Sequence, residues 1–402
     1  MAEVVIIGAG ASGMAAAIAA AARPENSVTL IERQSRVGRK LLSTGNGRCN
    51  LTNMGAALKN YHGAEPGFAH PALEKWPPER VLEFFAELGL MTTTEYGGRV
   101  YPLSNQASSV LDVLRFGLEK SNIKLMTGVT VESVRRKGKG FLVSREGENI
   151  YCDRLIVACG GCAGSKLGGV MDGYNILKSL GHSRTALHPS LTQIRTRPEI
   201  PRSMKGVKVQ AGVCASKGKR VLAAGSGDLL FADNGVSGTV IFDISRAVSM
   251  AGEGVSLEID FFESLEKSGV KKYLYARREA RPAAPVREIF SGALHSRVGL
   301  ALCKYVGLNP EKPCCELAAG DLDALASAAK ALRLEVTGVS GFESAQVTAG
   351  GIATSEFDPH TMESRIVPYL YACGEVLDID GDCGGYNLQW AWASGLTAGG
   401  AV

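Results

Sequence analysis

The sequence predicts an α/β protein in which one α/β domain, formed by both ends of the chain, is interrupted by an insert that is first β-rich and then helical. A continuous apolar run at residues 4–7 and a second strand-like stretch at residues 27–31 flank a glycine-rich turn and an alanine-rich stretch. Continuous apolar runs of this length are typical of parallel strands covered on both faces. Glycine-rich strand and helix patterns return from Ala345 onward. The two ends are therefore expected to complete one domain around the insert.

The first half of the chain supplies the elements of that domain in order. The first strand, the alanine-rich helix and the second strand, which ends on Glu32, form a strand–helix–strand unit of about 30 residues. Apolar spacing and β-forming composition predict the elements that follow. These are helices at 78–88 and 105–120, short strands over 124–145, and a buried strand at 155–158.

The middle of the chain changes pattern twice. Residues 191–262 alternate polar and apolar side chains between glycine turns, which predicts β structure. Residues 266–332 favour helices that are broken at prolines. The expected boundaries are 1–189 and 339–402 for the discontinuous α/β domain, 190–265 for the β-rich insert and 266–338 for a helical subdomain of that insert.

Composition narrows the classes of partner. The 402 residues carry a formal net charge of +4 without a block of like charges, so we expect a small-molecule partner and neither a nucleic acid nor a membrane. The apolar run at 14–22 is far shorter than the roughly 20 residues of a membrane span. Ten cysteines without an even framework are expected to be reduced thiols of a cytoplasmic protein.

The first glycine-rich turn carries a dinucleotide fingerprint. It has the form G-x-G-x-x-G between a buried strand and a helix, with an acidic residue about 20 positions on. Gly8 permits the tight turn, Gly10 lets the backbone approach a pyrophosphate, and Gly13 lets the helix pack on the strand. Glu32 is expected to accept hydrogen bonds from the adenosine ribose hydroxyls. The candidate binding residues of this unit are Gly8, Gly10, Ala11, Ser12, Gly13, Glu32 and Arg33.

A second motif near the C-terminus favours FAD over NAD as the dinucleotide. The chain reads Gly374-Glu375 and then Gly385-Tyr386-Asn387-Leu388 at the start of a helix. A helix N-terminus at this place can direct N–H groups at the N1 and O2 edge of a flavin, where negative charge collects on reduction. A nicotinamide needs no such site. Glu375 is suited to the ribityl hydroxyls or the chain near the pyrophosphate, although an acid after a strand is also a common helix-capping residue.

A long run at residues 38–53, Gly-Arg-Lys-Leu-Leu-Ser-Thr-Gly-Asn-Gly-Arg-Cys-Asn-Leu-Thr-Asn, gives the chain a family resemblance. The chain resembles bacterial FAD-binding oxidoreductases known as aminoacetone oxidase-like proteins and relatives of the bile-acid flavin reductase. The resemblance continues through residues 98–102, 188–189, 347–351 and the closing Gly-Glu-Val-Leu-Asp-Ile-Asp and Gly-Gly-Tyr-Asn-Leu-Gln, so it covers essentially the whole chain.

This resemblance implies a Rossmann-like FAD domain of the glutathione-reductase type, split by a small β-barrel and a helical subdomain. It implies that Ser43, Thr44 and the Gly45-Asn46-Gly47 loop run beside the pyrophosphate and flavin, and that the Val131 backbone meets the adenine. Small residues there let amide N–H groups reach a ligand. The remaining candidate cofactor contacts are Arg39, Lys40, Cys159, Gly160 and Gly161.

The sequence departs from the family pattern in two places. Residues 231–239 read Phe-Ala-Asp-Asn-Gly-Val-Ser-Gly-Thr where relatives show Phe-Thr-His before Gly-x-Ser-Gly-Pro, and Cys159 stands where related flavoproteins often carry Thr. Because of the first change, a role that the family assigns to this insert loop does not carry over directly to residues 231–239. Cys159 and Cys162 form a C-x-x-C pair, which we interpret as packing because no second pair lies at zinc spacing. The histidines show no ligand spacing, so no metal is expected.

Three functions are open at this stage. The leading hypothesis is a reductase that takes hydride from NAD(P)H onto FAD and passes it to an unsaturated small organic substrate. No second G-x-G-x-x-G is present, so the nicotinamide would visit the flavin only transiently. The alternatives are an amine-type oxidase that uses O2 and a non-enzymatic flavin redox sensor. Tyr101, Tyr386 and Asp380 are the candidate proton donors.

Overall fold

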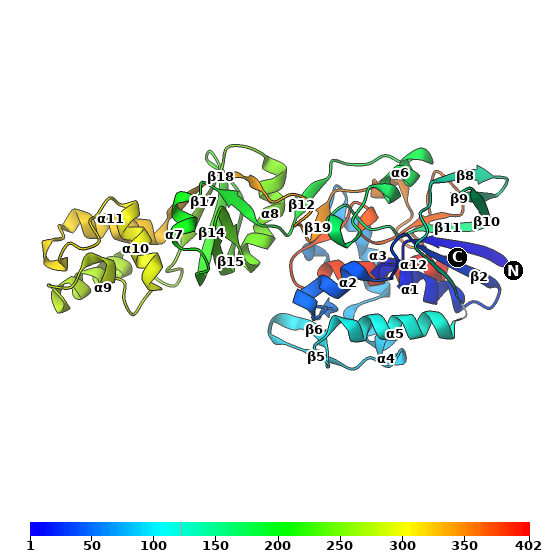
Figure 1. The fold of residues 1–402 in the computed structure, drawn as a ribbon, viewed down its shortest axis with the longest axis horizontal. Coiled ribbons are helices and arrows are strands. Elements are labelled where there is room, and N and C mark those ends of the chain that lie inside the picture. The colour runs from blue at the N-terminus through cyan, green and yellow to red at the C-terminus, as the bar shows by residue number, and fades with distance from the viewer. Residues whose placement is uncertain (122) are drawn as a thin grey trace. The chain divides into compact units, whose positions relative to one another are not determined.

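The computed structural model describes residues 1–121 and 123–402, and their contacts divide the chain into two units. The first unit contains both ends of the chain, residues 1–188 and 346–402, and the second contains residues 189–345. Both units can be followed by colour in Figure 1, with the chain ends in blue and red and the insert in green and yellow. The predicted fold class, an α/β domain with an inserted barrel, is confirmed.

A parallel sheet forms the centre of the first unit. Its five strands lie in the order β20-β11-β1-β2-β7. Within the sheet β1 pairs with β11 and β2, and the outer strands β20 and β7 pair with β11 and β2, all in parallel. The strands are β1 (Ala2–Ile7), β2 (Asn26–Glu32), β7 (Lys124–Thr127), β11 (Arg154–Val157) and β20 (Leu370–Ala372). Strands from before and after the insert thus share one sheet.

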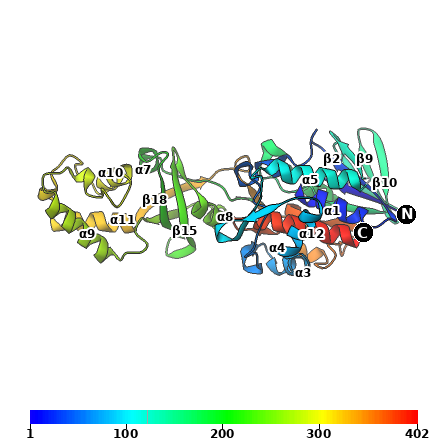
Figure 2. The ribbon, with the colours of Figure 1, turned by 90° about the horizontal axis from the view of Figure 1, so that it is seen from below.

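Two helices from opposite ends of the chain pack backbone to backbone beside this sheet. They are α1 (Ala11–Ala21) and α12 (Tyr386–Ala401), which run next to one another in Figure 2. A Cβ on Gly395 would overlap the Ser12 carbonyl, and one on Gly399 would overlap the Ala16 carbonyl. Only glycine permits this approach. The contact fixes the start of α12 relative to the first glycine-rich turn.

The other elements of the first unit surround the sheet. A three-stranded sheet in the order β3-β6-β5 and a second one in the order β10-β9-β8 lie outside the parallel strands. The helices are α2 (Arg39–Ser43), α3 (His70–Lys75), α4 (Pro78–Glu87), α5 (Ala107–Lys120) and α6 (Asp172–Ser179). The strands are β3 (Thr52–Asn53), β4 (Tyr61–His62), β5 (Thr92–Thr94), β6 (Arg99–Pro102), β8 (Ser133–Lys137), β9 (Gly140–Arg145), β10 (Glu148–Cys152), β19 (Val347–Ala349) and β21 (Asp380–Gly381). The short strand β12 (His188–Ser190) begins on the last residue before the division after residue 188.

The second unit is a closed barrel with helices on one core. Its strands follow the order β13-β16-β15-β14-β17-β18, and the buried apolar residues of barrel and helices form one continuous cluster. The strands are β13 (Ile194–Thr196), β14 (Lys208–Lys217), β15 (Arg220–Ala232), β16 (Gly235–Ser237), β17 (Val255–Asp260) and β18 (Leu332–Val339). The helices are α7 (Glu199–Ser203), α8 (Thr239–Ala251), α9 (Lys267–Ala280), α10 (Ser296–Tyr305) and α11 (Ala319–Lys330).

The structure differs from the sequence expectation at two places in this unit. Residues 239–251, expected in the β-rich segment, form α8, because Val240, Ile244 and Val248 bury one helical face although they are β-branched. Residues 332–338, expected in the helical subdomain, belong to barrel strand β18, whose side chains alternate between buried and exposed. The contact division also falls after residues 188 and 345 rather than after 189 and 338.

Candidate functional site

The first glycine-rich turn lies at the carboxyl end of β1, and its three glycines meet three different surroundings. A Cβ on Gly8, whose φ is +104°, would lie 2.5 Å from the Ala158 carbonyl oxygen. A Cβ on Gly13 would overlap the Gly8 carbonyl oxygen, whereas one on Gly10 would meet nothing within 4 Å. Gly8 and Gly13 therefore close the strand-to-helix junction. Gly10 leaves open space at the N-terminus of α1, where anions are favoured.

Glu32 ends β2 next to this turn and faces it. Its Oε2 accepts a hydrogen bond from the Ala9 N–H at 2.8 Å, and its Oε1 accepts one from the Gln34 N–H at 2.8 Å. Each carboxylate oxygen keeps a second acceptor position. The geometry is compatible with the expected contact to ribose hydroxyls.

The loop at residues 44–49 has an unusual backbone. Gly45, Asn46, Gly47 and Cys49 all have positive φ, between 56° and 84°. Tight turns of this kind are where backbone N–H groups can form an anion-binding concavity; here the Arg48 and Cys49 N–H groups donate to the Gly45 and Thr44 carbonyls of the loop itself. The side chains of Ser43 and Thr44 donate back to the Lys40 and Leu41 carbonyls, so they face their own helix α2. We therefore expect a ligand to contact the backbone of this loop rather than the hydroxyl groups of Ser43 and Thr44.

The start of α12 meets the residues that directly follow this loop. Gly385 is the N-cap of α12 with φ +100°, and a Cβ there would lie 2.6 Å from Thr52 backbone and 2.9 Å from the Asn50 Oδ1. A Cβ on Gly45 would lie 2.9 Å from the Asn50 nitrogen. Asn387 fixes the turn before the helix, since its Oδ1 accepts from the Gly381 N–H at 2.8 Å and its Nδ2 donates to the Gly381 carbonyl at 2.7 Å. Leu388 follows on the first turn of the same helix.

These surroundings fit a bound dinucleotide. The Asn50 Oδ1 is buried, and none of the residues that the structure describes donates a hydrogen bond to it. Buried polar atoms are rarely left unpaired, so this oxygen indicates a missing partner. Open space also surrounds the Cα atoms of Gly10, Gly47 and Gly160, where a Cβ would meet nothing within 4 Å. An unpaired acceptor and three open backbone approaches are what a long phosphate-bearing ligand requires.

Lys40 and Glu375 form an ion pair in the same unit. The Lys40 Nζ lies 2.7 Å from the Glu375 Oε2, and the Glu375 Oε1 accepts from the Thr348 N–H at 2.8 Å. Glu375 therefore has one protein partner on each oxygen, where the sequence predicted a ribityl or pyrophosphate contact. A Cβ on Gly161 would lie 2.6 Å from the Glu375 Oε1, so Gly161 packs against this carboxylate.

The other residues predicted to contact the cofactor have the following surroundings in the structure. The Arg33 Nε lies 3.8 Å from the Asp172 Oδ2, and the Arg39 Nη1 donates to the Gln34 Oε1 at 2.5 Å. The Cys159 Sγ lies 3.5 Å from the Ile7 carbonyl oxygen, beside the carboxyl end of β1. Val131 is buried with only 9% of its surface exposed. Ala11 begins α1, and the Ser12 Oγ would lie 2.5 Å from a Cβ on Gly374, so Ser12 packs against the second motif.

The three candidate proton donors lie in the same unit. Tyr101 on β6 is buried beneath Arg48, whose guanidinium carbon is 4.0 Å from the ring centroid. Asp380 is buried on β21, which pairs with β4. Tyr386 is partly exposed on the first turn of α12, and its ring meets Tyr61 edge to face at 6.4 Å. Of the three, only Tyr386 combines a place at this helix start with access to solvent.

The thiols of the site are protonated at neutral pH. Burial raises the pKa of Cys49 to about 12, and it also raises the pKa of Cys159 and of Cys162. A thiol in this state is a poor nucleophile and metal ligand. No disulfide joins the cysteines of the described residues. In the same part of the chain, no group of three or more His, Cys, Asp or Glu residues could hold a metal ion.

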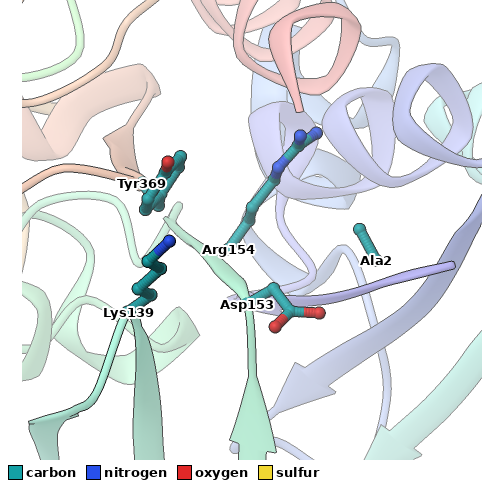
Figure 3. A pocket seen from close by; sticks show the side chains of 5 residues that line it. All are labelled: Ala2, Lys139, Asp153, Arg154 and Tyr369. Atoms are coloured by element: carbon teal, nitrogen blue, oxygen red, sulfur yellow. The ribbon is translucent and has the colours of Figure 1, made fainter.

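A small pocket lies elsewhere, where the sheet strands begin. It has a volume of about 220 Å³ and is lined by Ala2, Lys139, Asp153, Arg154 and Tyr369. Figure 3 shows the Lys139 side chain extending toward Tyr369, with Arg154 between them and Ala2. Ala2 and Arg154 start β1 and β11, whereas the glycine-rich turn follows the end of β1. The pocket is therefore separate from the candidate cofactor site.

Helices of the described residues are too short or too polar to cross a membrane.

Three residues of the site were not singled out by the sequence analysis. Asn50 supplies the unpaired buried oxygen, Asn53 ties two loops together, and Thr348 donates its N–H to Glu375. All three lie inside motifs that carry the family resemblance. Short polar residues within an otherwise glycine-rich or apolar motif are the signal that could have identified them.

Comparison with known proteins places these features in context. A family model described as "HI0933-like protein Rossmann domain" matches residues 2–401. The chain is 39% identical over 401 residues to a 3-dehydro-bile acid delta(4,6)-reductase of Clostridium scindens, covering 99% of this chain and 98% of that one. It is 30% identical over 397 residues to a ribosomal RNA dihydrouridine synthase of Escherichia coli, covering 98% and 96%. In fold it is similar to a solved 3-ketosteroid delta1-dehydrogenase of Sterolibacterium denitrificans, with a TM-score of 0.51, 13% identity and 99% of each chain covered.

Proposed function

The chain belongs to the HI0933-like family of Rossmann-domain proteins and is an FAD-dependent oxidoreductase, and from this premise we propose that it reduces a carbon–carbon double bond conjugated with a carbonyl group. The observation that carries the proposal is the 39% identity, over 99% of the chain, to a delta(4,6)-reductase of 3-dehydro-bile acids. A 3-oxo group conjugated with such double bonds is the reacting system that this name describes.

The chemistry of this reaction sets what the protein must provide. A hydride adds to the carbon remote from the carbonyl, a proton adds to the carbon next to it, and negative charge develops on the carbonyl oxygen between the two steps. FAD, when bound, supplies the hydride. The protein has to hold the substrate, donate one proton and stabilise charge with fixed dipoles.

The chain has groups suited to these tasks. The N-terminus of α12 presents the positive end of a helix dipole and its first N–H groups, which would stabilise negative charge on the bound ring. The concave loop at 44–47 and the open face of Gly10 would hold the phosphates. We assign the proton donor to Tyr386, because it lies on the first turn of α12 and is partly exposed.

The proposed electron donor is NADH or NADPH. The chain has a single G-x-G-x-x-G fingerprint, so the nicotinamide would visit the site and leave before the unsaturated substrate enters. Overall, one NAD(P)H and one proton are consumed for each double bond that is reduced. The amine oxidase that uses O2 and the flavin redox sensor are the alternatives that the experiment has to exclude.

A second candidate substrate is uridine within an RNA. The observation that favours it is the 30% identity to a ribosomal RNA dihydrouridine synthase over 98% of the chain. The C5–C6 double bond of uracil is likewise conjugated with a carbonyl, so one catalytic arrangement serves both substrates. The excess of Lys and Arg over Asp and Glu lies in residues 189–345, which would suit a polyanion.

Anaerobic titration of the FAD-loaded protein tests the proposal. NADH or NADPH should bleach the flavin, and a 3-oxo bile acid with double bonds at positions 4 and 6 should restore its colour and leave as the reduced product. Restoration by uridine-containing ribosomal RNA alone would select the second candidate. Failure of both nicotinamides to bleach the flavin would exclude the reductase. Tyr386→Phe should bleach normally but reduce the substrate about 100-fold more slowly or worse.

A further inference from the structure

We propose that Tyr96, on the turn between β5 and β6, forms an apolar wall of the substrate site against which the fused rings of a conjugated ketone lie. The inference rests on the proposed function and extends it to the substrate class. Nothing in the reaction chemistry itself requires this residue, so it would act on specificity.

The first observation is the exposure of the Tyr96 side chain. Its exposed fraction is 102%, more than that of any other large apolar side chain in the part of the chain that the structure describes. Isolated exposed apolar residues are common and need no explanation. An aromatic ring in full contact with water nevertheless gains free energy from any apolar partner, because covering it removes apolar area from water.

The second observation is that the turn carrying this ring is held firmly. Gly97 and Gly98 have φ of +77° and +79°, which only glycine adopts readily. The Asn53 Nδ2 donates to the Gly97 carbonyl at 3.2 Å, and a Cβ on Gly98 would lie 2.7 Å from the Asn53 Oδ1. Glu95 forms an ion pair with Arg48. These contacts anchor the backbone of the turn that carries Tyr96.

The third observation is that the same anchors belong to the candidate cofactor site. The Asn53 Nδ2 that binds Gly97 also donates to the Gly384 carbonyl at 3.0 Å, next to Gly385, the N-cap of α12. Arg48, which holds Glu95, directly follows the 44–47 loop. One amide and one guanidinium therefore connect the Tyr96 turn to both segments assigned to the cofactor.

Two residues near the turn bear on what the ring can contact. Met54 is 37% exposed, and its N–H donates to the Gly98 carbonyl at 2.8 Å, so it lies beside the turn. The charges of Glu95 and Arg48 are paired with each other. A phenol ring offers a flat, uncharged face of the kind that the face of a fused-ring ketone can cover.

The test compares binding by the FAD-loaded protein and three variants: Tyr96→Ala, Tyr96→Phe and Phe116→Ala. Phe116 is a matched control, since it is 62% exposed on α5. The change in flavin absorbance, without reductant, reports the Kd of a 3-oxo-4,6-diene bile acid and of uridine monophosphate. Turnover of 2-cyclohexen-1-one, a single-ring ketone, reports whether the chemistry is intact. Thermal unfolding checks the fold, which an exposed side chain should leave unchanged.

We expect Tyr96→Ala to raise the Kd of the bile acid at least 10-fold and to leave kcat/KM for cyclohexenone within about twofold of the parent protein. Tyr96→Phe and Phe116→Ala should bind the bile acid as the parent protein does. Equal bile-acid Kd values in Tyr96→Ala and the parent protein would overturn the role of Tyr96 while leaving the reductase intact. A loss confined to uridine monophosphate would overturn the ketone class. A parent protein that binds neither probe would overturn both proposals.

Discussion

The Lys40 ammonium and the Glu375 carboxylate lie 2.7 Å apart although 335 residues separate them in the sequence. Glu375 also accepts the Thr348 N–H, so three segments of the first unit meet at one carboxylate. The pair joins the helix before the 44–47 loop to the strand end that precedes α12. Both segments are assigned to the cofactor, and their relative position depends on this contact.

Removing the cation should loosen that connection. Lys40→Met is expected to lower the free energy of unfolding by about 1 kcal/mol, as for a partly exposed ion pair, and to weaken FAD retention several-fold. Lys40→Arg should restore most of both. Lys59→Met, at an exposed position on another loop, is the control. Thermal unfolding and the ratio of flavin to protein after gel filtration measure the two effects. Equal FAD retention in Lys40→Met and Lys59→Met would refute the assignment.

Substitution of two glycines of the first turn should separate an effect on folding from an effect on cofactor binding. Gly13→Ala places a Cβ on the Gly8 carbonyl, and we expect a loss of about 3 kcal/mol in stability or failure to fold. Gly10→Ala meets open space, so the apoprotein should unfold at nearly the parent temperature while its Kd for FAD rises at least 10-fold. Flavin fluorescence titration and thermal unfolding of apoprotein check this. Unchanged FAD affinity in Gly10→Ala would show that the ligand does not approach there.

Stability should fall on mild acidification because of His182. Its buried ring lies 2.7 Å from the Glu356 Oε2 through Nδ1, and its Nε2 lies 3.0 Å from the Ser364 Oγ, which already accepts two backbone N–H groups. Burial lowers the pKa of His182 below 6.5, although Glu356 acts in the opposite direction. The unfolded chain takes up a proton near pH 6.5 and the folded chain resists it, so the free energy of unfolding declines as the pH falls through that value.

Glu356 adds a contribution of the same sign at lower pH. Burial alone would raise the pKa of Glu356, but hydrogen bonds from Ser183 and His182 outweigh it and lower the pKa. Its stabilisation is present above the unfolded value near 4.5 and is lost below it. The Tm of the parent protein should therefore drop more between pH 7 and pH 5 than that of His182→Gln. His70→Gln, on an exposed helix position, is the control. A parent-to-variant difference that does not change with pH would contradict the prediction.

Alkylation should distinguish exposed from buried thiols. Cys315 is exposed, whereas burial raises the pKa of Cys49 and of Cys373 to about 12. Because the thiolate is the reactive form, iodoacetamide at pH 7 should modify Cys315 first, and Cys315→Ser should remove the fastest phase. Mass spectrometry locates the label. Turnover should survive this modification. Loss of turnover in Cys315→Ser on alkylation, prevented by substrate, would instead indicate a thiol within the substrate site.

The sequence determined the fold class and the cofactor motifs of this protein. The signals were local: strand periodicity, the spacing of Gly8, Gly10 and Gly13, and the glycine-rich start of α12. Each of these patterns predicts the conformation of its own segment from the residues within that segment. Local signals failed where burial overrode propensity, as in α8, where β-branched residues form a helix because that helix covers the barrel core.

The tertiary structure alone decided which distant residues share a contact. Glu375 is suited by type to a ligand hydroxyl, yet its oxygens bind Lys40 and the Thr348 N–H. Asn50 becomes notable only because folding buries its oxygen without a donor, and Asn53 because it bridges the Tyr96 turn and the start of α12. The Lys40–Glu375 and Asn53–Gly384 contacts join residues more than 300 positions apart. They follow from the packing of α1 against α12 and from the shared parallel sheet, and neither has a signature within a short window of sequence.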